Sequence, residues 1–490
     1  MSVPVADSTG ESRSTGLVQG LGLLDSTTIV MGSMIGSGIF IVAAEIAREV
    51  GSPGLFLLSW VISGVMTVAA AVTYGELAAM MPKAGGQYVY LRESFGPLFG
   101  FLYGWTLFLV IQTGTIAAVA VAFGKFLGVF FPSISDQHFL LNFGSISLFG
   151  HPTALTVSTQ QGVGILVLLG LGIINIFGVR TGAWVQNIFT VTKVGTLVAL
   201  VGVGLWWHAS HAQAASSAPV AAPAPSFWAG AHWDLATLMI LSVALVGPLF
   251  SSDAWNNITF TGAEVKNPKR NLPLALLLGT LIVCAVYFFC NVIYLRVLPF
   301  SGIQHAPADR VATAVMEAIF GLKGAAIMAA AIVISTFGCI NGMSLAGARV
   351  YYAMAKDGLF FPSVGKVSQK YRTPAVSLIV QAVWASLLTL SGTYNDLLDY
   401  VIFAVLLFYI LTILGLFRLR RTKPDAPRPY RAWGYPVVPI LYIVLAVFIE
   451  WALLLHRPMR SVAGLGIVAI GIPIYYFWRR RNSVSQQVNQ

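Results

Sequence analysis

Twelve apolar runs, each long enough to cross a membrane, dominate this sequence of 490 residues. A membrane-spanning helix needs about 20 consecutive apolar residues, and short polar segments separate the runs. We predict spanning helices over residues 26–49, 54–80, 96–130, 158–178, 183–206, 235–262, 273–298, 323–355, 374–391, 396–418, 437–455 and 462–480. The chain is therefore predicted to be an all-α integral membrane protein with twelve transmembrane helices in the lipid bilayer.

The composition agrees with a membrane protein and argues against several other classes. Only 10% of the residues are charged, whereas soluble domains contain about 25%. The net charge of +11 does not indicate nucleic-acid binding, because the basic residues lie between apolar runs, where they orient membrane helices. The sequence contains no P-loop, nucleophile motif or cluster of metal ligands, which argues against an enzyme or an ATP-driven pump. We therefore expect no cofactor and no metal.

The distribution of Lys and Arg predicts the orientation of the chain. Nineteen of these residues fall in loops on one side, and only five fall on the other side, namely Arg296, Arg310, Lys323, Arg457 and Arg460. Positive residues accumulate in cytoplasmic loops, so both termini are predicted to be cytoplasmic, with the protein in the cell membrane. Two long loops without Lys or Arg, 131–157 and 207–234, are predicted to lie outside.

The first predicted helix is interrupted by small residues. Residues 29–40 read Ile-Val-Met-Gly-Ser-Met-Ile-Gly-Ser-Gly-Ile-Phe, with three glycines and two serines in seven positions. Each glycine costs a helix about 1 kcal/mol relative to alanine, and non-helical backbone in a membrane survives only inside protein or beside a water-filled cavity. A second interpretation stays open, because Gly32 and Gly36 form a GxxxG pair of the kind that packs helices together.

The sixth predicted helix carries polar residues in its middle. Between Val246 and Asn257 it contains a proline, two serines, two asparagines and the ionisable Asp253. An ionisable residue within a membrane span indicates a functional site. Two interrupted helices at corresponding places in two five-helix halves are typical of the central site of a secondary transporter.

Such breaks suit a zwitterionic amino acid. Amides at the start of a second half-helix lie at the positive end of its dipole and bind a carboxylate, while carbonyls at the end of the first half-helix point at the ammonium group. Gly36, Ser37 and Gly38 let the backbone approach closely, since glycine carries no Cβ. The residues themselves thus predict a transporter of amino acids.

Several short motifs occur in one order along most of the chain. They are Gly36-Ser37-Gly38-Ile39-Phe40, Tyr74-Gly-Glu76-Leu77, Pro82-Lys83-Ala-Gly-Gly-Gln-Tyr88, Val185-Gln186-Asn-Ile-Phe189-Thr-Val-Thr-Lys193, Trp255-Asn256-Asn257, Glu264-Val-Lys-Asn267-Pro268, Ser335-Thr-Phe-Gly338-Cys-Ile-Asn341-Gly342 and Ala348-Arg349. In this order and spacing the chain resembles the amino acid–polyamine–organocation superfamily, and within it the L-type amino acid transporter branch.

The resemblance implies a leucine-transporter-like fold, with two inverted five-helix repeats, two further helices, and helices one and six broken at mid-membrane. On this sequence it implies a cytoplasmic tail at 1–24, a first repeat at 25–206, an outer loop at 207–234, a second repeat at 235–420, two further helices at 421–480 and a cytoplasmic tail at 481–490. Animal members pair with a heavy chain through a cysteine between helices three and four. Loop 131–157 has no cysteine, so no disulfide-linked partner is expected.

The resemblance also implies the substrate site. The substrate carboxylate would meet the amides of Ser37 and Gly38, and the ammonium group would meet the carbonyls of Met34 and Phe250 near Asp253. The Phe250 side chain would cover the substrate. The predicted substrate-binding set is Met34, Ile35, Gly36, Ser37, Gly38, Phe250, Asp253, Trp255 and Asn256.

Lys193 is matched to a helix-five lysine that, in this family, points at the place where sodium-coupled relatives hold an ion. That implies transport without sodium. Its expected partners are the backbone of Gly32–Gly36 and the hydroxyls of Ser335 and Thr336. Lys193 acts either as a structural tether or as a group that couples transport to protons. The role of Asp253 also remains open. It could be a substrate ligand, a proton carrier or a cap on a broken helix end.

Three functions remain on the sequence alone. The first is a sodium-independent permease that moves L-amino acids by alternating access, through exchange or with protons. The second, favoured by the acidic Asp253, is a carrier of cationic amino acids or polyamines. The third is a non-transporting amino-acid sensor, which usually carries an added soluble domain that neither the short N-terminus nor residues 481–490 offer.

Overall fold

A computed structural model describes residues 19–148, 151–177, 179–216, 227–368, 371, 373–390 and 394–488. The first 18 residues of the predicted N-terminal tail, residues 217–226 of the predicted outer loop and the last two residues of the predicted C-terminal tail lie outside these ranges. Most of the described residues are helical, as predicted.

The helices follow one another with short connections. They are α1 (Leu23–Met34), α2 (Gly38–Val50), α3 (Pro53–Met80), α4 (Gln87–Phe95), α5 (Pro97–Thr106), α6 (Gln112–Leu127), α7 (Thr159–Ile176), α8 (Val179–Ser216), α9 (Leu235–Ala244), α10 (Val246–Ser251), α11 (Asn257–Phe260), α12 (Pro268–Val297), α13 (Phe300–Gln304), α14 (Val311–Lys356), α15 (Ala375–Thr389), α16 (Tyr394–Thr422), α17 (Val437–His456) and α18 (Pro458–Val488). A π-helical turn, Leu107–Ile111, joins α5 to α6.

The lengths and apolar character of these helices make the chain a multi-pass membrane protein. Among the described residues, nine helices are long and apolar enough to cross a membrane, and the bent pair α1 and α2 brings the number to ten. Two shorter apolar stretches are Leu235–Ser251 and Ala375–Thr389. Large apolar side chains such as Leu166 on α7 and Ile327 on α14 are exposed, as expected where helices face lipid.

Strands occur in one predicted loop, and two helices extend beyond their predicted ends. Loop 131–157 contains an antiparallel hairpin of β1 (Phe139–Leu148) and β2 (His151–Ser158), which agrees with its Ile, Thr and Val content. Helix α8 continues to Ser216, so the first residues of the predicted outer loop are helical. Helix α18 continues to Val488, so most of the predicted C-terminal tail is helical as well. Strong helix formers such as Ala and Gln extend a helix beyond its apolar run, and the predictions followed the apolar run alone.

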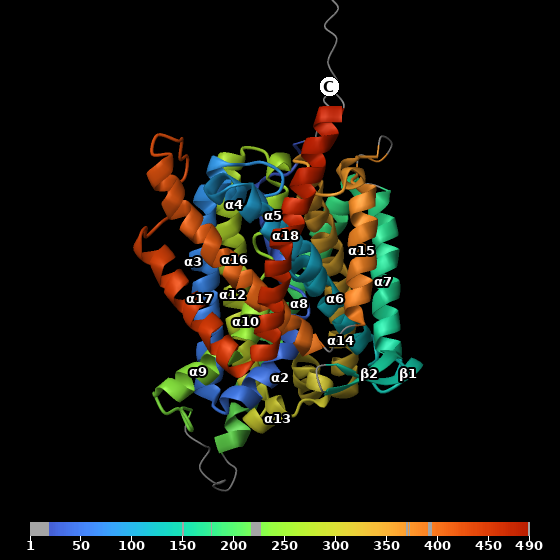
Figure 1. Ribbon diagram of the computed structural model, residues 1–490. Coiled ribbons are helices and arrows are strands. Elements are labelled where there is room, and N and C mark those ends of the chain that lie inside the picture. Colours follow the sequence, from blue (N-terminus) through green and yellow to red (C-terminus); the bar gives the residue numbers. More distant parts are fainter. Residues whose placement is uncertain are drawn as a thin grey trace, which may run out of the picture.

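The helices form one bundle with the loops gathered at its two ends (Figure 1). The hairpin, α9 and α13 lie at one end of the bundle, and α4 and the C-terminal end of α18 lie at the other (Figure 1). Inside the bundle, α12 packs against α3 and α1, and α14 packs against α6 and α8.

Candidate functional site

The first helix is interrupted between α1 and α2, within the segment of glycines and serines. Helix α1 ends at Met34, α2 begins at Gly38, and the two helices are bent by 42°. Ile35 has extended backbone angles, with φ −76° and ψ 92°. The first amides of α2 have no intrahelical acceptor, so a row of donors at the positive end of the α2 dipole faces the break.

The sixth helix is broken beside it. Helix α10 ends at Ser251, residues 252–256 are not helical, and the short α11 follows. Ala254 takes a left-handed conformation, with φ at +62°. The start of α2 packs against α10, and a Cβ on Gly38 would lie 2.9 Å from the Cα of Ser251. Any larger residue would clash with Ser251, so glycine at position 38 allows α2 to pack closely against α10.

An aromatic pair covers this contact. The Ser37 hydroxyl lies 3.0 Å from the Tyr394 hydroxyl, and the rings of Phe250 and Tyr394 meet edge to face with centroids 6.0 Å apart. Phe250 therefore lies near the helix-one break, which it approaches through Tyr394.

The two carbonyls predicted to face an ammonium group each accept one hydrogen bond. The carbonyl of Met34 accepts from the Tyr287 hydroxyl at 3.1 Å, and the carbonyl of Phe250 accepts from the Asp253 amide at 3.2 Å. A carbonyl oxygen has two lone pairs, so each keeps one acceptor position.

Lys193 is fully buried and bonded to the first broken helix. Its ammonium group donates to the carbonyl of Gly32 at 2.8 Å. The hydroxyl of Ser335 on α14 donates to the carbonyl of Gly36 at 3.5 Å. The hydroxyl of Thr336 donates to the carbonyls of Ile332 and Val333 within its own helix.

Asp253 and Trp255 belong to a separate group of side chains. The Asp253 carboxylate accepts from the Tyr409 hydroxyl at 2.7 Å. The Trp255 ring packs against the rings of Tyr74 and Tyr409, with centroids 4.8 Å and 5.3 Å away. Neither of the two small pockets that Asp253 lines includes residues 34–38. The structure thus directs the acidic side chain toward α16.

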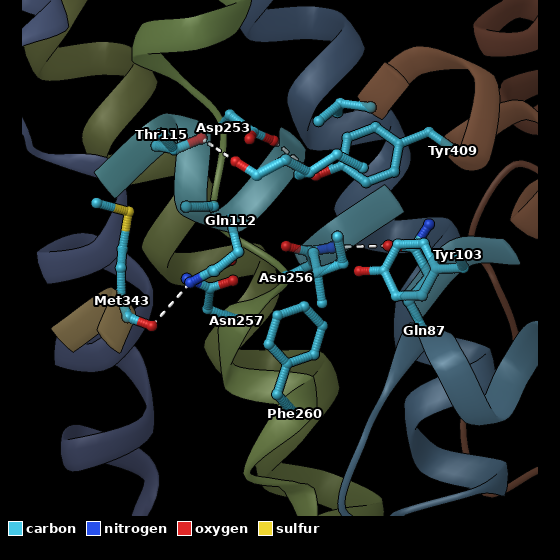
Figure 2. Close-up of a pocket in the computed structure, with 14 residues that line it drawn as sticks. Gln87, Tyr103, Gln112, Thr115, Asp253, Asn256, Asn257, Phe260, Met343 and Tyr409 are labelled. Atoms are coloured by element: carbon cyan, nitrogen blue, oxygen red, sulfur yellow. Dashed lines mark hydrogen bonds between the residues drawn. The ribbon is translucent and has the colours of Figure 1, made fainter. Parts of the chain in front are cut away.

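One of these pockets, the polar pocket, lies between α6, α11, α14 and α16 (Figure 2). Asn256 donates to the side chain of Gln87 at 2.9 Å, and Gln112 donates to the carbonyl of Met343 at 2.8 Å. The space that remains is about 10 Å³, which is room for about one water molecule. The polar members of its lining are Gln87, Tyr103, Gln112, Thr115, Asp253, Asn256, Asn257 and Tyr409.

Similarity to known proteins agrees with this architecture. A sequence profile described as "Amino acid permease" matches residues 21–474. The chain belongs to the amino acid permease family. It is similar to the "Serine/threonine exchanger SteT" of Bacillus subtilis, with 29% identity over 96% of this chain and 99% of the relative. It is also 29% identical to the human "b(0,+)-type amino acid transporter 1" over 95% of this chain and 89% of the relative.

A third relative of the permease is the human "Large neutral amino acids transporter small subunit 2", with 28% identity over 97% of this chain and 84% of that protein. The predicted superfamily and the prediction of a transporter in place of an enzyme are confirmed. Within the described residues, no group of three or more His, Cys, Asp or Glu side chains is arranged to hold a metal ion.

The permease uses several side chains at its breaks that the sequence did not single out. Tyr394 and Tyr409 on α16 and Tyr287 on α12 reach the broken helices from distant parts of the chain. Cys339 on α14 donates from its thiol to the carbonyl of Ser33 at 3.4 Å. Gln112 carried a usable signal, because a polar amide inside an apolar run marks a functional position in a membrane helix.

Proposed function

We propose that this permease moves L-amino acids across the cell membrane by alternating access, without sodium, and exchanges one amino acid for another. The observation that carries the proposal is the contact between the first turn of α2 and the last turn of α10. It brings donors and acceptors for both ends of a zwitterion into one place. The exchange mode is supported by the relative whose printed name describes an exchanger.

The proposed cradle binds the amino acid through the backbone. The amides of Ser37 and Gly38 receive the carboxylate, and the remaining lone pairs of the Met34 and Phe250 carbonyls receive the ammonium group. The Phe250 ring covers the substrate. Ile35 and Gly36 form the rest of the non-helical segment between α1 and α2. Asp253, Trp255 and Asn256 are the proposed substrate-binding residues after α10, on the side of α16.

The absence of a sodium requirement is proposed from Lys193. Its buried ammonium group supplies a fixed positive charge 2.8 Å from the Gly32 carbonyl, on the break that a bound cation would otherwise support. A buried cation needs such oxygen partners. Release of the Lys193 proton is the proposed route if transport is coupled to protons in place of exchange.

A second candidate is a carrier of cationic amino acids or polyamines. The supporting observation is the carboxylate of Asp253, which is 7% exposed and lines both small pockets. Its bond to Tyr409 occupies one carboxylate oxygen and leaves the other for a cation.

The proposed topology has twelve spans. The ten candidate spans and the two shorter apolar stretches, Leu235–Ser251 and Ala375–Thr389, support this number. We assign residues 25–206 and 235–420 to two inverted repeats and place both termini in the cytoplasm. No disulfide-linked partner is proposed, because the three cysteines lie at positions 284, 290 and 339, away from loop 131–157.

The topology can be checked with tags. A tag at either terminus is expected to react with a membrane-impermeant reagent only after the membrane is opened, because nineteen of the loop cations lie on the proposed cytoplasmic side. A tag in loop 207–234 should react in intact cells and serves as the control. Labelling of the C-terminal tag in intact cells would contradict an even number of spans.

Transport can be tested with purified protein in proteoliposomes. A panel of radiolabelled L-amino acids is offered to vesicles with and without internal amino acid, in sodium or choline buffer. We expect uptake that rises several-fold with internal amino acid and does not change when choline replaces sodium. A clear sodium requirement would contradict the role of Lys193, and uptake driven by a pH gradient into empty vesicles would replace exchange with proton coupling.

A further inference from the structure

The loop between α16 and α17 carries more positive charge than nearby carboxylates neutralise. It lies beside α4, at the end of the bundle proposed to be cytoplasmic (Figure 1). Residues 418–431 contain six arginine or lysine residues and one acidic residue, Asp425. Among the described residues, two carboxylates from elsewhere pair with these cations, Glu76 of α3 and Glu93 of α4. Subtracting the three carboxylates from the six cations leaves three cations in excess.

Glu76 fixes the shape of this loop from the inside. Its fully buried carboxylate accepts two hydrogen bonds from Arg420, at 3.0 Å and 2.6 Å, and one from the amide of Ala432, at 2.7 Å. The Arg420 guanidinium group also lies 3.6 Å from the centre of the Tyr435 ring. The backbone on both sides of position 433 is thus held against the bundle, so the side chains that point outward start from a fixed frame.

Arg431 and Trp433 are the outward side chains on either side of Ala432. Both are exposed, Trp433 at 76%, and no group in the described part of the chain pairs with the Arg431 guanidinium. Tryptophan collects at the boundary between bilayer and water. The apolar span α17 begins at Val437, four residues after Trp433. This short separation places Trp433 at the level of the lipid headgroups, with Arg431 beside it.

An exposed apolar stripe on α17 continues from Trp433 into the membrane. Its members are 48–68% exposed and are spaced three or four residues apart, on one face of the helix: Val437, Leu441, Val444 and Val447. From the first to the last member the helix rises about 15 Å, which is half of the roughly 30 Å hydrocarbon core of a bilayer. Because α17 lies at the outer edge of the bundle (Figure 1), the stripe is open to an acyl chain.

We propose that this surface, the lipid face, binds one anionic phospholipid. Arg431 donates to the headgroup phosphate, Trp433 packs against the glycerol backbone, and an acyl chain follows the α17 stripe. The guanidinium fork matches the oxygens of a phosphate group, and basic segments at the cytoplasmic surface attract anionic lipids. The site is separate from the proposed substrate cradle, and its existence does not depend on which amino acid is transported.

A zwitterionic lipid or a second copy of the chain fits the lipid face less well. The three excess cations of the loop attract a headgroup with a net negative charge and repel the cationic group of phosphatidylcholine. A second copy related by a two-fold axis along the membrane normal would bring its own cationic loop to the same side of the membrane, where the two loops repel each other.

Native mass spectrometry of the purified, delipidated protein tests the site. Phosphatidylglycerol and phosphatidylcholine with identical acyl chains are titrated separately. We expect one phosphatidylglycerol to bind about tenfold more tightly or better, because each basic residue near an anionic lipid favours binding by a factor of about five. Arg431→Gln removes a charged hydrogen bond and is expected to weaken phosphatidylglycerol binding by about tenfold. Arg431→Lys keeps the charge and should weaken it by no more than about threefold.

Arg270→Gln is the matched control. Arg270 is exposed in the first turn of α12, on the same proposed side of the membrane, and no tryptophan adjoins it in the sequence. Its replacement removes the same charge and should leave both lipid affinities within about twofold of wild type, as expected for a cation outside a site. Phosphatidylglycerol brominated near the ester end of its acyl chains locates the lipid, because part of its quenching of tryptophan fluorescence should be absent in Trp433→Phe.

Several outcomes would overturn the inference. Equal affinities of the wild-type protein for the two lipids, or unchanged phosphatidylglycerol binding by Arg431→Gln, would remove the headgroup contact. An equal loss in Arg270→Gln would show attraction by net charge without a site on α17. Glycerol phosphate that binds as tightly as phosphatidylglycerol would exclude the acyl chain, and dimers that displace the lipid would assign the face to a second copy. None of these results bears on amino-acid exchange.

Discussion

Replacing Lys193 by methionine is expected to lower the exchange rate of every amino-acid substrate by about tenfold to a hundredfold. The Lys193 ammonium group donates to the carbonyl of Gly32 at 2.8 Å and is fully buried. A hydrogen bond to a charged group contributes about 1.5–3 kcal/mol, and each 1.4 kcal/mol corresponds to a factor of ten. Methionine keeps the length of the side chain and removes the charge. Initial exchange rates in proteoliposomes measure the effect.

The pattern of the loss identifies the role of Lys193. Because the side chain touches the backbone of α1 and not the proposed cradle, all substrates should lose rate to the same degree, while substrate binding in detergent stays within a few-fold of wild type. Lys125→Met is the control. Lys125 lies near the end of α6, 3.6 Å from Asp309, and such a partly exposed pair contributes about 0–1 kcal/mol. If Lys193→Met exchanges amino acids at the wild-type rate, the hydrogen bond from Lys193 on α8 to Gly32 on α1 is not required for transport.

The breaks themselves could be predicted because they depend on local sequence. Three glycines and two serines within residues 32–38, and Asp253 among serines and asparagines, lower the helix propensity over one or two turns. The structure interrupts the helices at Ile35–Ser37 and at residues 252–256, inside those segments. Non-helical backbone cannot face lipid, because its polar groups would have no hydrogen-bond partners there. A cluster of such residues inside an apolar run therefore indicates a break that is buried within the protein.

The partners of the breaks could not be predicted in the same way. Ser37 meets Tyr394, which is 357 residues away along the chain, and Asp253 meets Tyr409 on the same distant helix. Tyrosines in membrane helices usually pack against apolar neighbours, so no local pattern separates these two from the rest. Which helices meet depends on the packing of the whole bundle. For that reason the bond between the Asp253 carboxylate and Tyr409 on α16 could not be read from the sequence.

Arg349 on α14 and Glu264 form a buried ion pair. Both residues are 7% exposed, and the guanidinium group donates to both carboxylate oxygens, with Nη2 3.1 Å from Oε2. Arg349→Met would leave a buried carboxylate without its cation, which typically costs about 3–5 kcal/mol. For a chain of this size that corresponds to a fall in Tm of about 3–5 °C. Thermal unfolding of the purified protein in detergent measures it.

Two further variants show whether the charge is the cause. The double variant Arg349→Met with Glu264→Gln leaves no unpaired charge, so it is expected to recover most of the lost stability. Arg92→Met removes the partner of Asp357 in a more exposed pair and should change the Tm by only about 0–1 °C, as surface pairs contribute about 0–1 kcal/mol. A double variant as unstable as Arg349→Met would show that the arginine acts through packing of its side chain alone.

The position of this pair connects its stability to transport. The carbonyl of Glu264 accepts the amides of Gly20 and Leu21 at 2.9 Å and 3.0 Å, and the amide of Lys266 donates back to Leu21 at 2.8 Å. The segment before α1 is thus bonded to the segment after α11, and the ion pair fixes both to α14. If α1 swings during alternating access, these backbone bonds must open, whereas the Arg349–Glu264 pair need not. We therefore expect the double variant, once its fold is recovered, to exchange amino acids at a rate close to wild type, in contrast to Lys193→Met.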